Sequence, residues 1–156
     1  MADFPSSPDD VVLVGHSMGG FVISEVANRH PDRVKELVYV AAMLPSKDDS
    51  ISGLAASFGT KPKDALEEFT KYPSGLSTLV KQPQGPLGFK FNPSGKFDAI
   101  TKTYVYTDND KIIPQASQTG MTSHFSTLAV SNIATGHLPQ YEEKDKLVDL
   151  LAQTLT

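Results

Sequence analysis

Cysteine and tryptophan are both absent from this chain of 156 residues. Without cysteine there is no disulfide framework, no thiolate nucleophile and no zinc–thiolate site. Basic residues are also few. The 14 lysines and arginines are outnumbered by 18 aspartates and glutamates, the net charge is −4, and no basic cluster favours binding to nucleic acid. No apolar stretch approaches the roughly 18 residues that a membrane span needs.

The N-terminus lacks the features of a secretory signal. Residues 1–8 contain neither a basic segment nor an apolar segment of the kind that such a signal requires. Together these absences predict one cytoplasmic domain, residues 1–156, that binds no metal or cofactor. Its expected partner is a small-molecule substrate, with no role for a membrane or for nucleic acid.

What the sequence does contain is a glycine-rich turn, Gly15-His16-Ser17-Met18-Gly19, directly behind the apolar run 11–14. A buried strand that breaks at Gly-x-Ser-x-Gly and runs into a helix is the signature of a nucleophile elbow. Ser17 is expected at the apex in a strained conformation, with Gly15 and Gly19 removing clashes two residues away. The helix expected over 20–29 begins under Ser17. Its N-terminus favours negative charge, and the backbone N–H of Met18 is the expected oxyanion donor.

Three further apolar runs predict the remaining strands. Residues 37–42 form a continuous apolar run, typical of a strand that is buried on both faces. Strand, helix and strand in such close succession form a βαβ unit and therefore predict a parallel sheet. Residues 100–106 and 128–133 predict the third and fourth strands. A closing helix over 140–155 is expected to bury one stripe of leucines: Leu147, Leu150, Leu151 and Leu155.

Residues 45–101 differ in composition from the rest of the chain. Their glycines are scattered, and prolines interrupt them at Pro45, Pro62, Pro73, Pro83, Pro86 and Pro93. This composition is typical of a loop-rich insertion or cap over a site. One helix is expected within it, over 63–72, and another after the third strand, over 115–124. Apolar residues of the insertion either line a pocket or fasten it to the body, and both readings stay open: Phe58, Leu76, Leu79, Leu87, Phe89 and Phe91.

A serine nucleophile needs a base to take its proton. His137 is the best of the four histidines, because it follows a predicted strand and a glycine that lets the backbone turn. His16 is expected to point away from the elbow apex and to be structural, and His30 belongs to a helix end. His124 ends a predicted helix and is the remaining competitor.

The acid that orients the base is one of two aspartates behind the third strand. Asp110 precedes Lys111-Ile112-Ile113-Pro114, where the apolar pair and the proline lock the loop, whereas Asp108 is placed to brace it. We favour Asp110. The order Ser17, Asp110, His137 is that of nucleophile, acid and base in hydrolases with a nucleophile elbow, and each residue lies at the C-terminal end of a predicted strand.

From Asp10 onward the chain resembles the α/β-hydrolases, and within them the esterase and hydroxynitrile-lyase-like group. The pieces that carry this resemblance are residues 11–20, 30–34, 37–42 and 110–114 and the pair Gly136-His137. The resemblance implies a truncated α/β-hydrolase fold, with about four parallel strands flanked by helices and a cap over about 45–101. It also implies the catalytic roles of Ser17, Asp110 and His137.

The chain departs from that family at its N-terminus. In the family, several strands and a loop that donates a second oxyanion amide precede the elbow, whereas only a short segment precedes it here. The strand at Val11–Val14 is then expected to form an apolar sheet edge. Such an edge pairs readily with another chain, so we expect a homo-oligomer joined at this strand or an interface covered by a helix.

The favoured function is a carboxylesterase that cleaves small esters through an acyl-enzyme on Ser17. Two alternatives stay open. The same three residues fit a carbon–carbon lyase of the hydroxynitrile-lyase type, in which His137 is the essential base. A truncated hydrolase could also act as an interaction module.

Overall fold

The computed structural model describes residues 11–71 and 83–154, and within them the chain forms a four-stranded sheet. The strands lie in chain order, β1-β2-β3-β4, and every neighbouring pair is parallel. Their bounds are Val12–His16 for β1, Glu36–Val40 for β2, Thr101–Thr107 for β3 and Leu128–Ile133 for β4. The predicted α/β class with four parallel strands is therefore confirmed.

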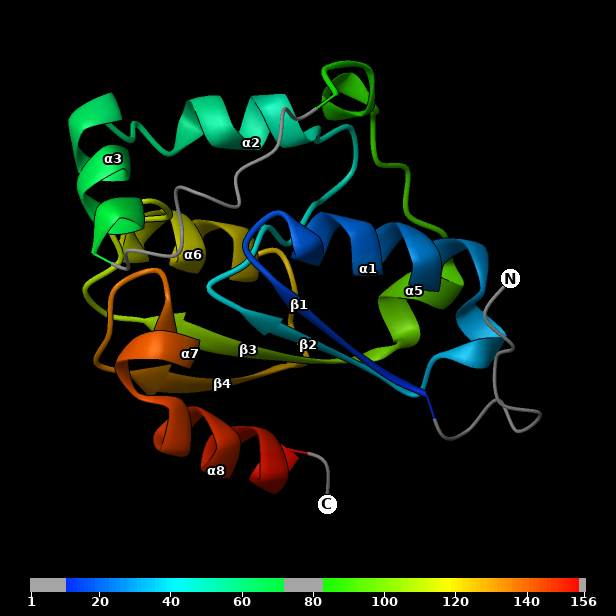
Figure 1. The fold of residues 1–156 in the computed structure, drawn as a ribbon. Coiled ribbons are helices and arrows are strands. Elements are labelled where there is room, and N and C mark those ends of the chain that lie inside the picture. The colour runs from blue at the N-terminus through cyan, green and yellow to red at the C-terminus, as the bar shows by residue number, and fades with distance from the viewer. Residues whose placement is uncertain (1–10, 72–82, 155–156) are drawn as a thin grey trace.

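Helices cover both faces of the sheet (Figure 1). One face carries α1 (Gly19–Arg29), α5 (Gly95–Ala99) and α6 (Gln115–Thr122), and the other carries α8 (Lys144–Thr154). The pleat of β2 explains its continuous apolar run. Leu37 and Tyr39 pack into the cluster that contains the α1 side chains, whereas Val38 and Val40 pack with Leu147 of α8.

The two outer strands are less buried than the strands between them. All five residues of β2 are buried, but Val14 of β1 is 47% exposed and Val130 of β4 is 55% exposed. In the described part of the chain, β1 pairs with a neighbour on one side only. It therefore occupies the edge position that the sequence predicts for it.

The segment between β2 and β3 contains more helix than we predicted. The helices in its described residues are α2 (Ile51–Ser57), α3 (Pro62–Thr70), the short 3-10 helix η3 (Gly85–Gly88) and α5. The helix predicted over 63–72 corresponds to α3, whereas α2 and α5 were missed. Each of the two helices follows a serine that caps its N-terminus, and this residue type is a sequence signal for the start of a helix. Ser50 accepts a hydrogen bond from the N–H of Gly53 in α2, and Ser94 accepts one from the N–H of Phe97 in α5.

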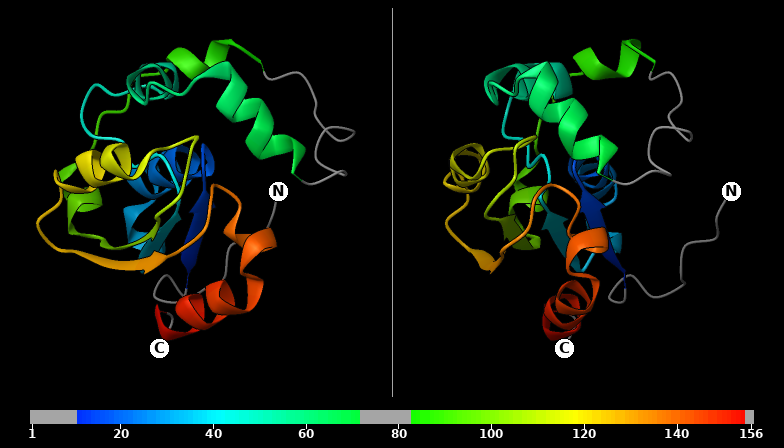
Figure 2. Two further views of the ribbon diagram at one scale, coloured as in Figure 1. Left: turned by 90° about the vertical axis from the view of Figure 1, so that its left-hand side faces the viewer. Right: turned by 60° about the vertical axis from the view of Figure 1, so that its left-hand side comes forward.

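The insertion arches over α1 and α6 on the side of the molecule away from α8 (Figure 2). Phe58 and Phe91 are buried in the main core, so these two residues fasten the insertion to the body. Phe89 is 44% exposed and lines a groove on the surface. Leu76 and Leu79 lie outside the described residues.

The chain ends in two helices instead of one. α7 (Pro139–Glu142) and α8 are separated at Glu143, whose φ of −142° and ψ of 53° are not helical. Leu147 is buried against the sheet and Leu150 and Leu151 are partly buried, while Leu155 lies outside the described residues. The helix predicted over 115–124 is α6, which ends at Thr122. None of the helices within residues 11–71 and 83–154 has the length and apolar character to span a membrane.

Candidate active site

Ser17 occupies the apex of the turn between β1 and α1 with a φ of +55°, a conformation that side chains rarely adopt. A Cβ at Gly15 would lie 2.9 Å from backbone atoms of Gly19 and Gly20, so this glycine is needed for the turn to close. Our expectation for Gly19 is wrong, because a Cβ there would meet no atom of another element within 4 Å. The second glycine that the packing requires is Gly20, where a Cβ would lie 2.4 Å from the carbonyl oxygen of Met43.

Three side chains from separate strand ends form a continuous line of hydrogen bonds. The Nε2 atom of His137 lies 2.8 Å from Oγ of Ser17, and its Nδ1 lies 2.9 Å from Oδ2 of Asp110. Because a carboxylate only accepts, Nδ1–H donates to Asp110, and Nε2 of the neutral ring is left to accept from the serine hydroxyl. The side chains of His137 and Asp110 are 1% and 0% exposed. The base and the acid are therefore shielded from water, whereas Ser17 is partly exposed.

Asp110 and Asp108 have separate roles in the loop after β3. Oδ1 of Asp110 accepts the N–H groups of Ile112 and Ile113 at 2.7 and 2.9 Å, so the loop wraps around the carboxylate. Asp108 is exposed, and its Oδ1 accepts from the side chains of Gln115 and Asn132 at the surface. The aspartate that contacts the histidine is Asp110, and Asp108 braces the loop.

Two residues that we did not predict, Thr107 and Gln118, form hydrogen bonds that hold the loop after β3 in place. The hydroxyl of Thr107 donates to Oδ2 of Asp110 at 2.9 Å. The fully buried Gln118 of α6 accepts the N–H of Thr107 and donates to its carbonyl, its hydroxyl and the carbonyl of Ile113. A glutamine in an amphipathic helix carries no local sign of this role. Sequence reasoning therefore had no means of finding it.

His16 lies inside the site, contrary to our expectation that it points away. Its Nε2–H donates to the backbone carbonyl of His137 at 2.7 Å, and the two rings are 4.9 Å apart between centroids. Burial, with a smaller contribution from the neighbouring His137, lowers the pKa of His16 below its usual value. His16 is therefore neutral and acts as a support for the base. His124 instead lines a separate cavity beside Asp98 and Lys102.

The backbone N–H of Met18 lies next to the serine and donates no hydrogen bond to another described residue. It belongs to the N-terminal turn of α1, where the helix dipole favours an anion. The role of this amide as an oxyanion donor stays a prediction. Within the described ranges, no three histidine, aspartate or glutamate side chains are grouped so as to hold a metal ion.

A family model described as the alpha/beta hydrolase family matches residues 1–150. The chain belongs to this family. Among curated relatives, Methylesterase 7 of Arabidopsis thaliana is 26% identical over 187 residues, covering 98% of this chain and 72% of the relative. The pyrethroid hydrolase of Sphingobium wenxiniae is 26% identical over 179 residues, covering 90% of this chain and 62% of the relative.

A solved structure gives the same result for the fold. An extracellular alpha/beta-hydrolase from a Paenibacillus species superposes with a TM-score of 0.77 at 24% identity, over 93% of this chain and 72% of that chain. This hydrolase chain thus spans between three fifths and three quarters of the length of these relatives. The predicted resemblance to α/β-hydrolases is confirmed.

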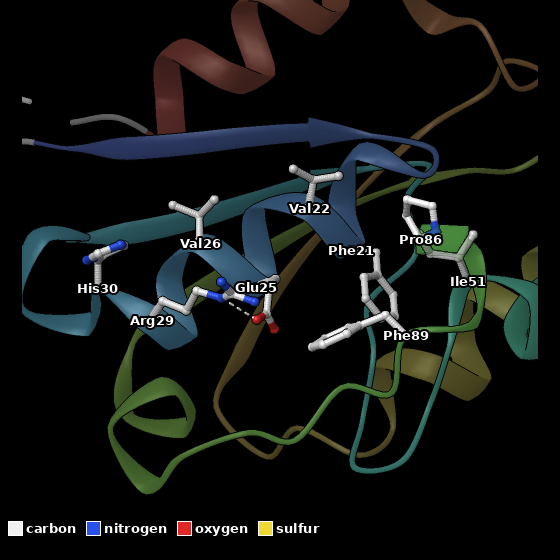
Figure 3. Close-up of a pocket in the computed structure, with 9 residues that line it drawn as sticks. All are labelled: Phe21, Val22, Glu25, Val26, Arg29, His30, Ile51, Pro86 and Phe89. Carbon is white, nitrogen blue, oxygen red and sulfur yellow. Dashed lines mark hydrogen bonds and ion pairs between the residues drawn. The ribbon is translucent and has the colours of Figure 1, made fainter. Parts of the chain in front are cut away.

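A groove of about 420 Å³ on the surface of this hydrolase is lined by none of the three hydrogen-bonded residues (Figure 3). One wall is the outer face of α1, with Val22 and Val26 at its centre, and the opposite wall is formed by Ile51, Pro86 and Phe89. Ser17, Asp110 and His137 do not line it. Among the exposed apolar residues of the insertion, Phe89 lines this groove, whereas Phe69 lies edge-on to the ring of His137 with 6.4 Å between the ring centroids.

Proposed function

We propose that this chain is a serine carboxylesterase in which Ser17 is the nucleophile, His137 the general base and Asp110 the residue that orients the base. The observation that carries the proposal is the line of hydrogen bonds from Ser17 Oγ through both ring nitrogens of His137 to Asp110. An alcohol becomes a useful nucleophile at neutral pH only when such a base accepts its proton.

In the proposed reaction, Oγ of Ser17 attacks the ester carbonyl while its proton moves to Nε2 of His137. The Met18 N–H stabilises the oxyanion of the tetrahedral intermediate. The imidazolium then protonates the alcohol as it leaves, and an acyl group remains on Ser17. Water attacks this acyl-enzyme with His137 again acting as base, which releases the acid and restores the serine hydroxyl.

Small esters are the proposed substrates. The matched relatives named methylesterase and pyrethroid hydrolase support ester hydrolysis over the cyanohydrin lysis that the same three residues could carry out. One oxyanion amide, that of Met18, is available in the described part of the chain. An ester with a good leaving group, such as p-nitrophenyl acetate, is therefore the sensitive probe, because it needs the least stabilisation of the oxyanion.

Labelling with a fluorophosphonate tests the proposal directly, because the probe reacts with an activated serine. We expect the wild-type protein to be labelled and Ser17→Ala to be unlabelled. Ser123→Ala is the matched control, because Ser123 is an exposed serine that bonds only its own helix. Hydrolysis of p-nitrophenyl acetate should follow the same order.

Absence of labelling in folded wild-type protein would contradict the esterase proposal and favour the interaction module. Labelling that persists in Ser17→Ala would place the nucleophile elsewhere. Labelling of Ser17 together with cleavage of an aromatic cyanohydrin, but not of esters, would favour the lyase.

A further inference from the structure

A buried glutamate of the insertion reaches the loop that carries the proposed base. Glu68 lies on α3, which runs beside the loop between β4 and α7 (Figure 2). Its side chain is 0% exposed, and its Oε1 accepts the backbone N–H of His137 at 2.9 Å across 69 positions of sequence. Its Oε2 accepts from Nζ of Lys71 at 2.9 Å. We propose that Glu68 is a positioning residue that fixes the base from the cap, an inference that rests on the proposed function.

Gly136, the residue before the base, has no side chain and so leaves space for the carboxylate of Glu68. A Cβ at Gly136 would lie 2.2 Å from Oε1 of Glu68 and 2.8 Å from Oε1 of Glu142. Any side chain at this position would therefore push the carboxylates away from the loop. The glycine that sequence reasoning assigned to a backbone turn has a second use, which is to leave room for an acceptor.

The carboxylates of Glu68 and Glu142 accept successive backbone N–H groups of the loop between β4 and α7. The N–H of Gly136 donates to Oε2 of Glu142 at 2.9 Å, one residue before the N–H of His137 donates to Glu68. Nζ of Lys71 bonds Glu68 and lies 3.8 Å from Oε1 of Glu142, so one cation serves both carboxylates. A buried charge that is paired in this way is stable, whereas an unpaired one is not.

With Glu68 included, side chains hold both backbone polar groups of the base. Glu68 accepts the N–H of His137, and His16 donates to its carbonyl oxygen. Removing the acceptor frees a buried N–H and allows the loop to move. A misplacement of about 1 Å in a catalytic group reduces rates by on the order of 10²-fold. The position of the base therefore depends on α3, an element of the cap.

The test compares Glu68→Met with Glu68→Gln in the full chain, using p-nitrophenyl acetate. Glu68→Met removes the acceptor, and we expect kcat to fall by roughly 10- to 100-fold with a much smaller change in KM. Glu68→Gln keeps an oxygen that can accept the N–H, so it should recover most of the lost kcat. Glu67→Met is the matched control, because Glu67 is an exposed neighbour on α3 that pairs with Lys111 at the surface.

A double-variant cycle keeps the inference falsifiable even if Glu68→Met lowers stability. Gly136→Ala should reduce kcat strongly in the wild-type background and clearly less in the Glu68→Met background, because the carboxylate nearer to the new Cβ, that of Glu68, is already gone. Additive effects, or a Glu68→Met variant as active as Glu67→Met, would overturn the role of Glu68. The wild-type protein would still label with fluorophosphonate in that case, whereas failure of the proposed function would abolish labelling in every variant.

Discussion

At the scale of single residues, His137 is held at four points. Its N–H donates to Glu68, its carbonyl accepts from His16, its Nδ1–H donates to Asp110, and its Nε2 lies 2.8 Å from Oγ of Ser17. A catalytic group whose rotamer and backbone are both fixed needs little reorganisation during the reaction. The supporting contacts are therefore expected to affect kcat more than KM.

The two aspartates after β3 provide a matched pair for the proposed mechanism. Asp110→Asn should lower kcat for p-nitrophenyl acetate by up to about 10⁴-fold, because an amide no longer selects the histidine tautomer that accepts the serine proton. Asp108→Asn, which alters only the surface brace to Gln115 and Asn132, should change kcat little. Equal losses in the two variants would contradict the role assigned to Asp110.

His16 predicts a specific loss of stability in acid. Its pKa lies below the usual 6.5 in the folded protein, so the unfolded chain binds more protons as the pH falls below about 6.5. The stability that neutral His16 provides is present above that pH and is lost on acidification. His16→Gln cannot titrate, so its Tm should fall less than that of wild type between pH 7 and 5. The exposed His124→Gln should follow wild type, and identical pH profiles for all three proteins would rule out this linkage.

At the scale of elements, the contact between α1 and the segment after β2 depends on Gly20. Gly20→Ala forces a Cβ against the backbone oxygen of Met43 and should destabilise the protein by about 1–3 kcal/mol. Gly19→Ala has room, and should be neutral or stabilising by up to ~1 kcal/mol because alanine favours a helix. Chemical denaturation of the two variants measures the difference. If Gly19→Ala were the more destabilising of the two variants, the close contact between Gly20 and Met43 would be contradicted.

The junction between α5 and β3 depends on a buried lysine. Nζ of Lys102 donates to the carbonyls of Phe97 and Ile100, and burial lowers its pKa from 10.5 to about 8. Between those values the unfolded chain binds more protons, so stability should rise with pH. The raised pKa values of Tyr39 and Tyr104 act in the opposite direction, with effects that begin near pH 10. The useful window is therefore pH 8 to 10.

The measurement for Lys102 is the difference in Tm between wild type and Lys102→Met across that window. Wild type should gain stability relative to the variant as the pH rises from 8 to 10. The tyrosines are unchanged in the variant, so their contribution cancels. Parallel curves would show that the lysine keeps its ordinary pKa in the folded protein.

At the scale of the whole molecule, the exposed edge of β1 supports the proposal of a homo-oligomer. β1 pairs with β2 on one side, and Val14 at its centre is 47% exposed. We expect light scattering at micromolar concentration to give a mass above that of a monomer, and Val14→Lys to reduce it, because a charge on an edge strand opposes pairing. Val130→Lys, on the opposite edge strand β4, is the matched control. A clean wild-type monomer would contradict the proposal.

Much of the fold could be predicted from the sequence because it depends on local patterns. The continuous apolar run of β2 requires burial on both faces, and the turn at Ser17 requires a glycine two residues earlier. Parallel strands then bring the residues that follow β1, β3 and β4 to one edge of the sheet. Spacing along the chain was thus sufficient to select Ser17, Asp110 and His137 as candidates, although their catalytic roles stay a prediction.

The sequence by itself therefore determined the class of fold and the candidate catalytic side chains, because hydrophobic periodicity and turn chemistry depend on residues that are close together in the chain. Only the tertiary structure decided which aspartate meets His137, that the second required glycine is Gly20, and that Glu68 reaches the base. These outcomes depend on close packing between segments far apart in the chain. Contacts of that kind leave no periodic trace in the sequence, because they require only that one side chain fit at one place.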